Sequence, residues 1–149
     1  MLTKDFKEFL ELLNEHKVKY LLVGGHAVIY YGHVRYTGDL DVWISNSKIN
    51  AQKMLKVIEK FGFASLGLSA KDFMVEDVII QLGYEPDRID IMTSIGGIKF
   101  NESYKRRVKT SIESVEVCLL SKEDLKKNKK SVGRLQDLTD LEKLTKKKI

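Results

Sequence analysis

The chain has 149 residues, of which 43% are apolar, with 26 Lys and Arg against 21 Asp and Glu. This composition is typical of a folded domain with its own core, and we expect one domain over residues 1–149. The lone Cys118 excludes an internal disulfide and a thiolate zinc cluster. No apolar run reaches the length of a membrane span, so we expect a cytoplasmic protein without membrane contact.

The net charge of +5 is carried by the C-terminal part of the chain. Residues 121–149 hold 10 basic and 5 acidic side chains, whereas residues 1–120 hold 16 of each. A lysine-rich end attracts phosphates through its long-range potential, but it is also typical of a solvated helix face. Both interpretations stay open on the sequence.

Helical and strand patterns alternate in the first part of the chain. Apolar residues recur at helical spacing or form short runs that end at glycines. These patterns predict helix, strand, helix, strand and helix at residues 4–16, 20–23, 26–32, 39–44 and 51–61.

The second part is predicted to hold a β-hairpin, a further strand and two helices. Alternating residues 78–84 and 89–91 flank turn residues, and a strand at residues 115–120 precedes a helix that ends near Gly133. The final helix carries a leucine stripe that we expect to face the core. Its members are Leu135, Leu138, Leu141 and Leu144. The mixed order predicts an α+β fold rather than a doubly wound parallel sheet.

Two carboxylates share one face of the strand at residues 39–44. Asp39 and Asp41 are two residues apart and point the same way, with Leu40 and Val42 on the other face. Such a pair repels itself unless a cation or hydrogen-bond donors compensate it. Hard divalent cations with oxygen ligands are the natural compensation.

A third carboxylate is expected beside this pair. Asp90 lies between Ile89 and Ile91, so it faces away from the core on a strand that could neighbour Asp39 and Asp41. Three such carboxylates can hold two magnesium ions for phosphoryl or nucleotidyl transfer. The third can instead accept the proton of an attacking hydroxyl.

Gly24 and Gly25 follow the first predicted strand and precede a helix. Glycines let a backbone approach a ligand closely, and free N–H groups at a helix start favour anions. A triphosphate is therefore expected here, although the spacing matches neither a Walker A nor a dinucleotide-binding loop. In the loop before the acidic strand, Arg35 and Thr37 are candidate phosphate contacts, and a salt bridge is the alternative role for Arg35.

In these motifs the chain resembles the nucleotidyltransferase superfamily that shares the DNA polymerase beta-type palm. The matching residues are Val23-Gly24-Gly25, Asp39-Leu40-Asp41-Val42 and Asp90. More narrowly, it resembles small prokaryotic nucleotidyltransferase-like proteins related to AbiEii-type toxins. This narrower likeness rests on Gly24-Gly25-His26-Ala27, Arg35-x-Thr37-x-Asp39, and a C-terminal motif that includes Lys129, Arg134, Asp137 and Asp140.

The resemblance implies a palm-like mixed sheet flanked by helices, with a C-terminal helical segment. It implies that Asp39, Asp41 and Asp90 bind two Mg²⁺ ions, with Mn²⁺ as a substitute, and that Gly24 and Gly25 hold a nucleoside triphosphate. Lys129 matches a basic position that we assign to a phosphate, together with Arg35 and Thr37. We expect Arg134 to pair with Asp137.

The activity implied is transfer of a nucleoside monophosphate to a hydroxyl acceptor, with release of pyrophosphate. The acceptor could be tRNA or another RNA, a protein or a small molecule. The alternative is a nucleotide-binding module without turnover, for example one that binds an antitoxin partner.

Overall fold

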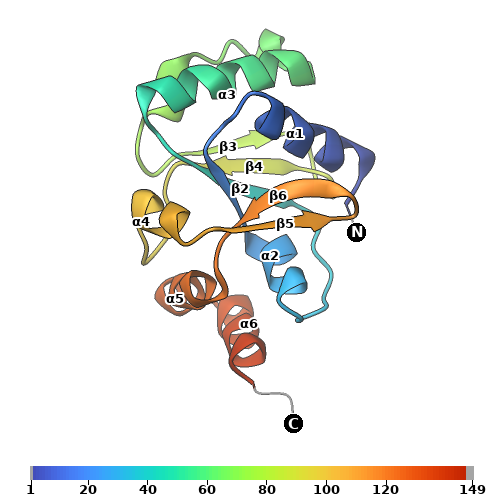
Figure 1. Cartoon of the computed structure of the whole chain (residues 1–149), viewed down its shortest axis with the longest axis vertical. Helices are drawn as coiled ribbons and strands as arrows, with labels where there is room; N and C mark the ends of the chain where they lie inside the picture. The colour runs from blue at the N-terminus through green and yellow to red at the C-terminus, as the bar shows by residue number, and fades with distance from the viewer. Residues whose placement is uncertain (1, 147–149) are drawn as a thin grey trace.

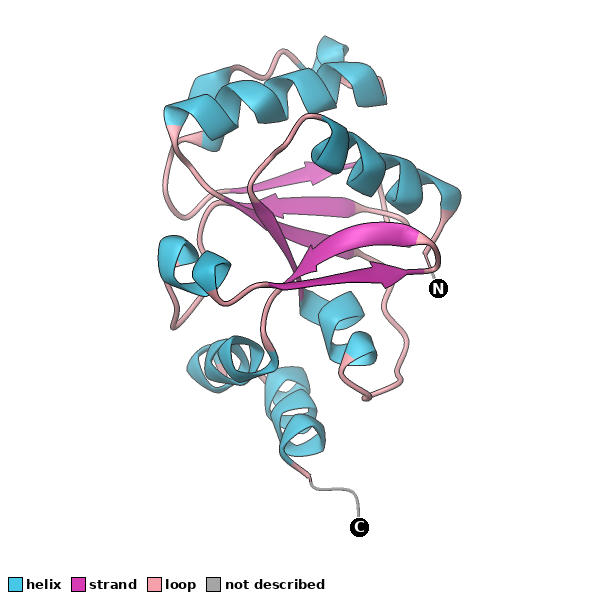
Figure 2. Ribbon diagram, in the orientation of Figure 1, coloured by secondary structure: helices cyan, strands magenta, loops and turns pink. Residues whose placement is uncertain are grey.

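The computed structural model describes residues 2–146, which form a mixed six-stranded sheet with helices on both of its faces (Figures 1 and 2). The helices are α1 Lys4–Glu15, α2 Gly24–Tyr30, α3 Lys48–Phe61, α4 Phe100–Lys105, α5 Lys122–Val132 and α6 Leu135–Thr145. The strands are β1 Tyr20–Val23, β2 Leu40–Ile44, β3 Ile79–Leu82, β4 Ile89–Met92, β5 Val108–Ile112 and β6 Val115–Leu119. Two short 3₁₀ helices, Ala64–Leu66 and Ala70–Phe73, follow α3.

The strand order is β3-β4-β2-β1-β6-β5. The central pairs are β1 antiparallel to β2, β2 parallel to β4 and β1 parallel to β6. Two antiparallel hairpin partners, β3 and β5, form the edges. This arrangement confirms the predicted α+β class and the hairpin between β3 and β4.

Helix α1 shows how the sequence pattern sets the packing. Thr3 caps the helix, because its hydroxyl accepts a hydrogen bond from the Phe6 amide at 3.1 Å. Phe6, Phe9, Leu10 and Leu13 then recur at helical spacing and are all buried in the core. Burying one such side chain stabilises a fold by roughly 1.5–3 kcal/mol.

Trp43 packs on the sheet face opposite to that covered by α1 and α3. Its indole is 1% exposed and meets the ring of Phe100, at the start of α4, edge to face with centroids 5.1 Å apart. By strand alternation Trp43 lies on the same face of β2 as Asp41. Its place is therefore in the core between sheet and helix.

The leucine stripe of α6 does not face the core, contrary to the sequence prediction. Leu135 is 86% and Leu138 is 48% exposed, and only Leu144 of the four leucines is fully buried. The buried face of α6 instead carries Asp137 and Asp140, which pair with cations from other elements. Ion pairing over long sequence separations thus decides the orientation of this helix. Among residues 2–146, no helix is both long and apolar enough to cross a membrane.

Candidate functional site

The sheet brings Asp41 and Asp90 side by side. Strands β2 and β4 run parallel with Asp41 opposite Asp90, and Val23 at the end of β1 is the other neighbour of Asp41. Asp39 precedes β2 by one residue, so the three predicted carboxylates meet at one end of the central strands. The expectation that the strand of Asp90 neighbours the strand of Asp41 is therefore confirmed.

The two glycines lie directly against the loop and strand that carry the site. At Gly24, whose φ is +67°, a Cβ atom would stand 2.1 Å from Asp41 Oδ2. At Gly25, a Cβ atom would stand 2.3 Å from the hydroxyl of Thr37. No side chain fits in either gap, so the glycines let Asp41 and Thr37 approach the backbone at the start of α2.

Arg88 lies between the carboxylates. Its Nε and Nη2 atoms donate to the two oxygens of Asp90 at 2.7 and 3.0 Å, and Nη2 also donates to Asp39 Oδ2 at 2.9 Å. The sequence predicted no role for Arg88. Its position directly before β4 and two residues before Asp90 was the available signal, because residues two apart in extended backbone share a face.

Burial and mutual repulsion favour the protonated forms of two of these aspartates. Burial, followed by the charges of Asp90 and Asp39, raises the pKa of Asp41 to about 7. Burial also raises the pKa of Asp39 above its ordinary value, against the opposing charge of Arg88. The site therefore carries more negative charge than its own cations balance, which is typical of functional carboxylates.

The donor set fits a hard divalent cation at Asp39 and Asp41. Asp39 Oδ1 is buried and has no hydrogen-bond partner, and carboxylate oxygens are the ligands that such cations prefer. In residues 2–146, however, no three His, Cys, Asp or Glu side chains are grouped closely enough to hold a metal ion. Because both oxygens of Asp90 are bonded to Arg88, its role as a third ligand stays a prediction.

A second group of charges joins α5, α6 and the loop before β2. Lys129 is 5% exposed, and its Nζ lies 3.1 Å from Asp137 Oδ1 and 3.0 Å from Asp140 Oδ2. Arg35 holds Asp140 from the other side, with Nε and Nη2 at 2.9 and 3.0 Å from its oxygens. The expected pair of Arg134 with Asp137 is also present, at 2.7 Å.

These contacts bear on the residues assigned to the nucleotide. Arg35 adopts the salt-bridge alternative, and Lys129 is occupied by two aspartates, so their contact with phosphate stays a prediction. Lys129 still lies near enough to Asp41 for its charge to lower that residue's pKa. The side chain of Arg134 is 76% exposed, and the charge of Asp41 helps to raise its pKa. Arg134 is therefore an exposed cation whose charge interacts with that of Asp41.

His26, next to the glycines, points into the core. It is 6% exposed, and its ring meets the ring of Phe6 edge to face at 5.7 Å. Burial lowers the pKa of His26 to about 4, so the imidazole is neutral at pH 7. It lies in the first turn of α2 and makes no capping hydrogen bond there.

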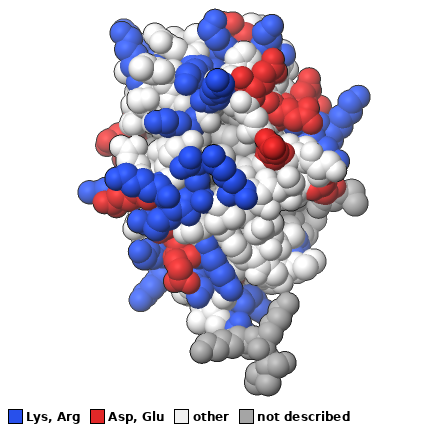
Figure 3. All heavy atoms as spheres, viewed as in Figure 1, with Lys and Arg blue, Asp and Glu red and all other residues white. Residues whose placement is uncertain are grey.

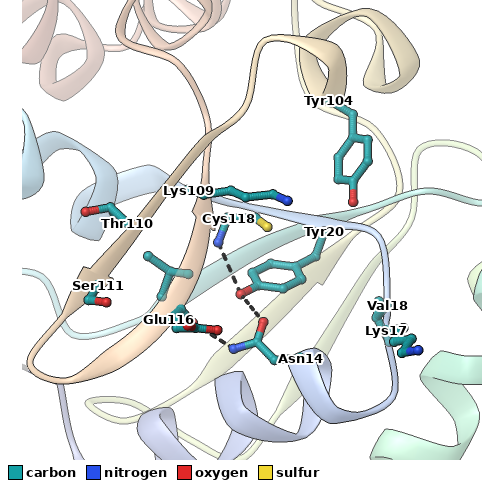
Figure 4. Close-up of a pocket in the computed structure, with 11 residues that line it drawn as sticks. Asn14, Lys17, Val18, Tyr20, Tyr104, Lys109, Thr110, Ser111, Glu116 and Cys118 are labelled. Carbon is teal, nitrogen blue, oxygen red and sulfur yellow. Dashed lines mark hydrogen bonds between the residues drawn. The ribbon is translucent and has the colours of Figure 1, made fainter.

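A cavity of about 610 Å³ opens at the other end of β1, between α1, α4 and the β5–β6 hairpin (Figure 4). Polar groups of its wall already bond one another. The Tyr20 hydroxyl accepts from the Cys118 amide and donates to Asn14, whose amide donates to the Glu116 carbonyl. None of the candidate site residues lines this cavity.

Charge is unevenly distributed over the surface. In the view of Figure 3, basic side chains extend from α3 at the top to α4 and α5 below, whereas acidic ones gather around α1. Some of the basic groups near α4 and α5 are paired, such as Arg106 with Asp124 at 3.0 Å and Lys126 with Glu123 at 3.5 Å. The basic end predicted from the sequence is thus partly neutralised within the fold.

Solved structures with this fold include several nucleotidyltransferases. The lincosamide antibiotic adenylyltransferase LnuA, with lincomycin bound, is 20% identical with a TM-score of 0.60, over 97% of this chain and 96% of its own. TM1012 from Thermotoga maritima, assigned as a nucleotidyltransferase, is 14% identical with a TM-score of 0.61, over 92% and 88%. An antigenic nucleotidyltransferase-like protein from Paracoccidioides brasiliensis is 16% identical with a TM-score of 0.56, over 96% and 77%.

At these identities the structural likeness establishes the fold. No curated protein sequence matches the chain significantly. A family model described as "Nucleotidyltransferase of unknown function (DUF6036)" matches residues 1–146, which is nearly the whole chain. A glycine pair and three aspartates meet at the end of the mixed sheet of this chain. With a match over nearly its whole length, the chain belongs to this nucleotidyltransferase family.

Proposed function

We propose that the protein transfers a nucleoside monophosphate from a nucleoside triphosphate to a hydroxyl acceptor, with a divalent cation held by Asp39 and Asp41. The observation that carries this proposal is the close approach of Gly24 to Asp41, where a Cβ atom would stand 2.1 Å from the carboxylate. It brings the backbone at the start of α2 and the Asp41 carboxylate to the same point. A triphosphate and its cation require both.

The residues divide the work by position. Asp39 and Asp41 hold the cation, which when bound neutralises charge on the triphosphate and polarises the phosphoryl group under attack. Mg²⁺ is the expected ion, and two ions require Asp90 as a further ligand. Gly24 and Gly25 let Asp41 and Thr37 lie directly against the backbone that the proposal assigns to the triphosphate. Arg134, which is exposed and interacts electrostatically with Asp41, is assigned to a phosphate oxygen.

The acceptor is proposed only as a hydroxyl compound. LnuA, a lincosamide adenylyltransferase, has nearly the same length and fold, which supports a small molecule as one acceptor class. The basic side chains near α4 and α5 support a polyanion such as RNA as a second acceptor class, because clustered Lys and Arg attract phosphates. A protein side chain is the third class.

The experiment incubates the protein with each α-phosphate-labelled nucleoside triphosphate and a cell extract, with Mg²⁺, with Mn²⁺ or with chelator. Label that enters RNA, protein or a small molecule identifies the acceptor class directly. We expect transfer by the wild type with metal and a loss of about 10³-fold in Asp41→Asn. This factor corresponds to several kcal/mol of transition-state stabilisation, at 1.36 kcal/mol per factor of ten.

The matched control is Asp5→Asn, which removes the same charge from an exposed position in the first turn of α1. It should transfer label like the wild type. Full activity in Asp41→Asn would refute the proposal. Metal-dependent binding of a nucleotide without transfer to any acceptor would favour the alternative, a nucleotide-binding module such as the partner of an antitoxin.

A further inference from the structure

The guanidinium of Arg88 uses all three of its nitrogen atoms on carboxylates. Nε and Nη2 hold the two oxygens of Asp90, Nη2 also holds Asp39 Oδ2, and Nη1 lies 3.2 Å from Glu85 Oε1. Planar two-point contacts of this kind are the strong form of arginine–carboxylate pairing. Arg88 is therefore firmly bound at the centre of the site.

The oxygens bound by Arg88 are the ones that a metal ion would need in order to add Asp90 as a third ligand. Asp90 has no oxygen left free of the guanidinium, and Asp39 keeps only Oδ1. The register of β2 and β4 holds Asp41 beside Asp90, so the negative charges cannot separate. Three aspartates in a fixed arrangement need a positive charge, and in the structure Arg88 supplies it.

We propose that Arg88 is an exchangeable counter-ion of the carboxylate site, which a divalent cation must displace from both oxygens of Asp90 and from Oδ2 of Asp39 before these oxygens can become ligands. This inference rests on the proposed function, because it takes the metal site assigned there. It makes metal binding a competition between two cations for the same oxygens. It also explains how the three carboxylates stay together before metal arrives.

Glu85 offers the displaced guanidinium a second partner. It lies on the turn between β3 and β4, three residues before Arg88, and its side chain is 67% exposed. The Arg88 side chain is itself 22% exposed, so it has a path toward solvent. A guanidinium that leaves Asp39 and Asp90 therefore keeps one carboxylate contact, which lowers the cost of the exchange.

The test is Mn²⁺ binding to the nucleotide-free protein, followed by electron paramagnetic resonance of the free ion. We compare the wild type with Arg88→Gln and with Arg106→Gln. Removing the competitor should tighten Mn²⁺ binding by about tenfold or more, because charge-assisted hydrogen bonds no longer have to be broken. Arg106→Gln is the matched control, because Arg106 makes the same two-point contact with another carboxylate, that of Asp124. Its affinity for Mn²⁺ should stay within about twofold of the wild-type value.

Thermal unfolding gives a second readout. Without metal, Arg88→Gln should unfold at a lower temperature than the wild type, because the aspartates lose their counter-ion. Saturating Mn²⁺ should raise its unfolding temperature more than it raises that of the wild type. Arg88→Lys keeps the charge but loses the two-point contact, so it should bind Mn²⁺ with intermediate affinity and provides the test if Arg88→Gln does not fold.

Glu85→Gln tests the second partner. In the wild-type background it should weaken Mn²⁺ binding, and in the Arg88→Gln background this effect should shrink to what the lost charge alone produces. An equal effect in both backgrounds would show that Glu85 does not act through Arg88.

Asp41→Asn distinguishes a failure of the Arg88 exchange from a failure of the metal site itself. If it removes Mn²⁺ binding while Arg88→Gln binds no tighter than the wild type, the metal site stands and the exchange is refuted. If Mn²⁺ binding is indifferent to Asp41→Asn, the proposed metal site itself is wrong. Tighter binding in Arg88→Gln that Asp41→Asn abolishes supports both.

Discussion

Two groups of aspartates in this protein differ in how fully basic side chains pair with them. At the end of the central strands, one arginine pairs with Asp39 and Asp90 but not with Asp41, and burial with mutual repulsion raises the pKa of Asp41 to about 7. Between α5, α6 and the loop before β2, two aspartates are held by Lys129, Arg35 and Arg134. Burial would raise the pKa of Asp140 too, yet hydrogen bonds from Arg35 and Lys129 hold it below its ordinary value.

The difference identifies what each group contributes. Fully compensated aspartates stabilise the packing of helix against loop, and they have no capacity left for another cation. Aspartates with too few cations cost stability and are available for one. The same residue type is thus fully paired with cations in one place, whereas in the other it has the unbalanced charge that the proposed metal site requires.

The largest effect is expected where the compensated group is broken. Asp140→Asn leaves the charges of Arg35 and Lys129 with one fewer partner in a buried setting, which costs about 3–5 kcal/mol of unfolding free energy. Urea denaturation measures this loss. The exposed Asp87→Asn is the control and should stay within about 0.5 kcal/mol of the wild type. A loss below about 1 kcal/mol in Asp140→Asn would contradict the assignment of a structural role.

The next effect has the opposite sign. Because the pKa of Asp41 is raised to about 7 in the folded state, the folded protein binds a proton between pH 4 and pH 7 that the unfolded chain has lost. This makes the contribution of Asp41 to stability fall as pH rises through that range. In the presence of chelator, the unfolding free energy of Asp41→Asn relative to that of the wild type should therefore rise by on the order of 2–4 kcal/mol between pH 4 and pH 8.

Denaturation at a series of pH values measures that gain. Asp140→Asn provides the contrast, because the folded pKa of Asp140 is lowered and its contribution is lost only as the solution becomes acidic below about pH 4. Its destabilisation should be constant from pH 5 to pH 8. Parallel pH profiles for the two variants would mean that the two groups do not differ as described.

A smaller effect is expected at the contact between the glycines and the site. Gly24→Ala puts a residue at φ +67° and a methyl group against Asp41, whereas Gly67→Ala meets φ +69° with nothing within 4 Å. Both variants pay the cost of a left-handed backbone, and only Gly24→Ala overpacks. Its excess destabilisation should be about 1–2 kcal/mol by urea denaturation. Equal losses would show that Asp41 moves aside freely.

The smallest effect is expected at the rim of the compensated group. The Arg134 side chain is 76% exposed, and Asp137 keeps Lys129 as a partner when Arg134 is removed. Arg134→Ala should therefore cost less than about 1 kcal/mol, by the same denaturation assay. A loss above about 2 kcal/mol would make Arg134 as structural as Asp140.

Much of the fold was predictable because its signals are local. Helix α1 has a cap and a clear apolar period, and Gly62 ends α3 with a φ of +101°, as a glycine after a helical pattern predicts. Helix α4 was not predicted, because its six residues are too few to establish a helical period. In β5 the exposed positions alternate with only partly buried ones, so no apolar pattern marks this edge strand.

The site was predictable as a set of residues but not as a set of contacts. Strand alternation placed Asp39, Asp41 and Asp90 on one face, and β2 and β4 are indeed neighbours. The partners of Asp140 are different, since Arg35 is 105 residues away in sequence. No local pattern reveals such a pair, and the leucine period of α6 therefore predicted the wrong face.

The place of Trp43 makes the protein its own optical probe. It is the only tryptophan of the chain, it is 1% exposed against Phe100, and it lies two residues from Asp41 on the same strand face. Its fluorescence should therefore be blue-shifted in the folded state and move to longer wavelength on unfolding, without contributions from other indoles. Every denaturation experiment above can be read through this emission, which reports on the strand that carries Asp41.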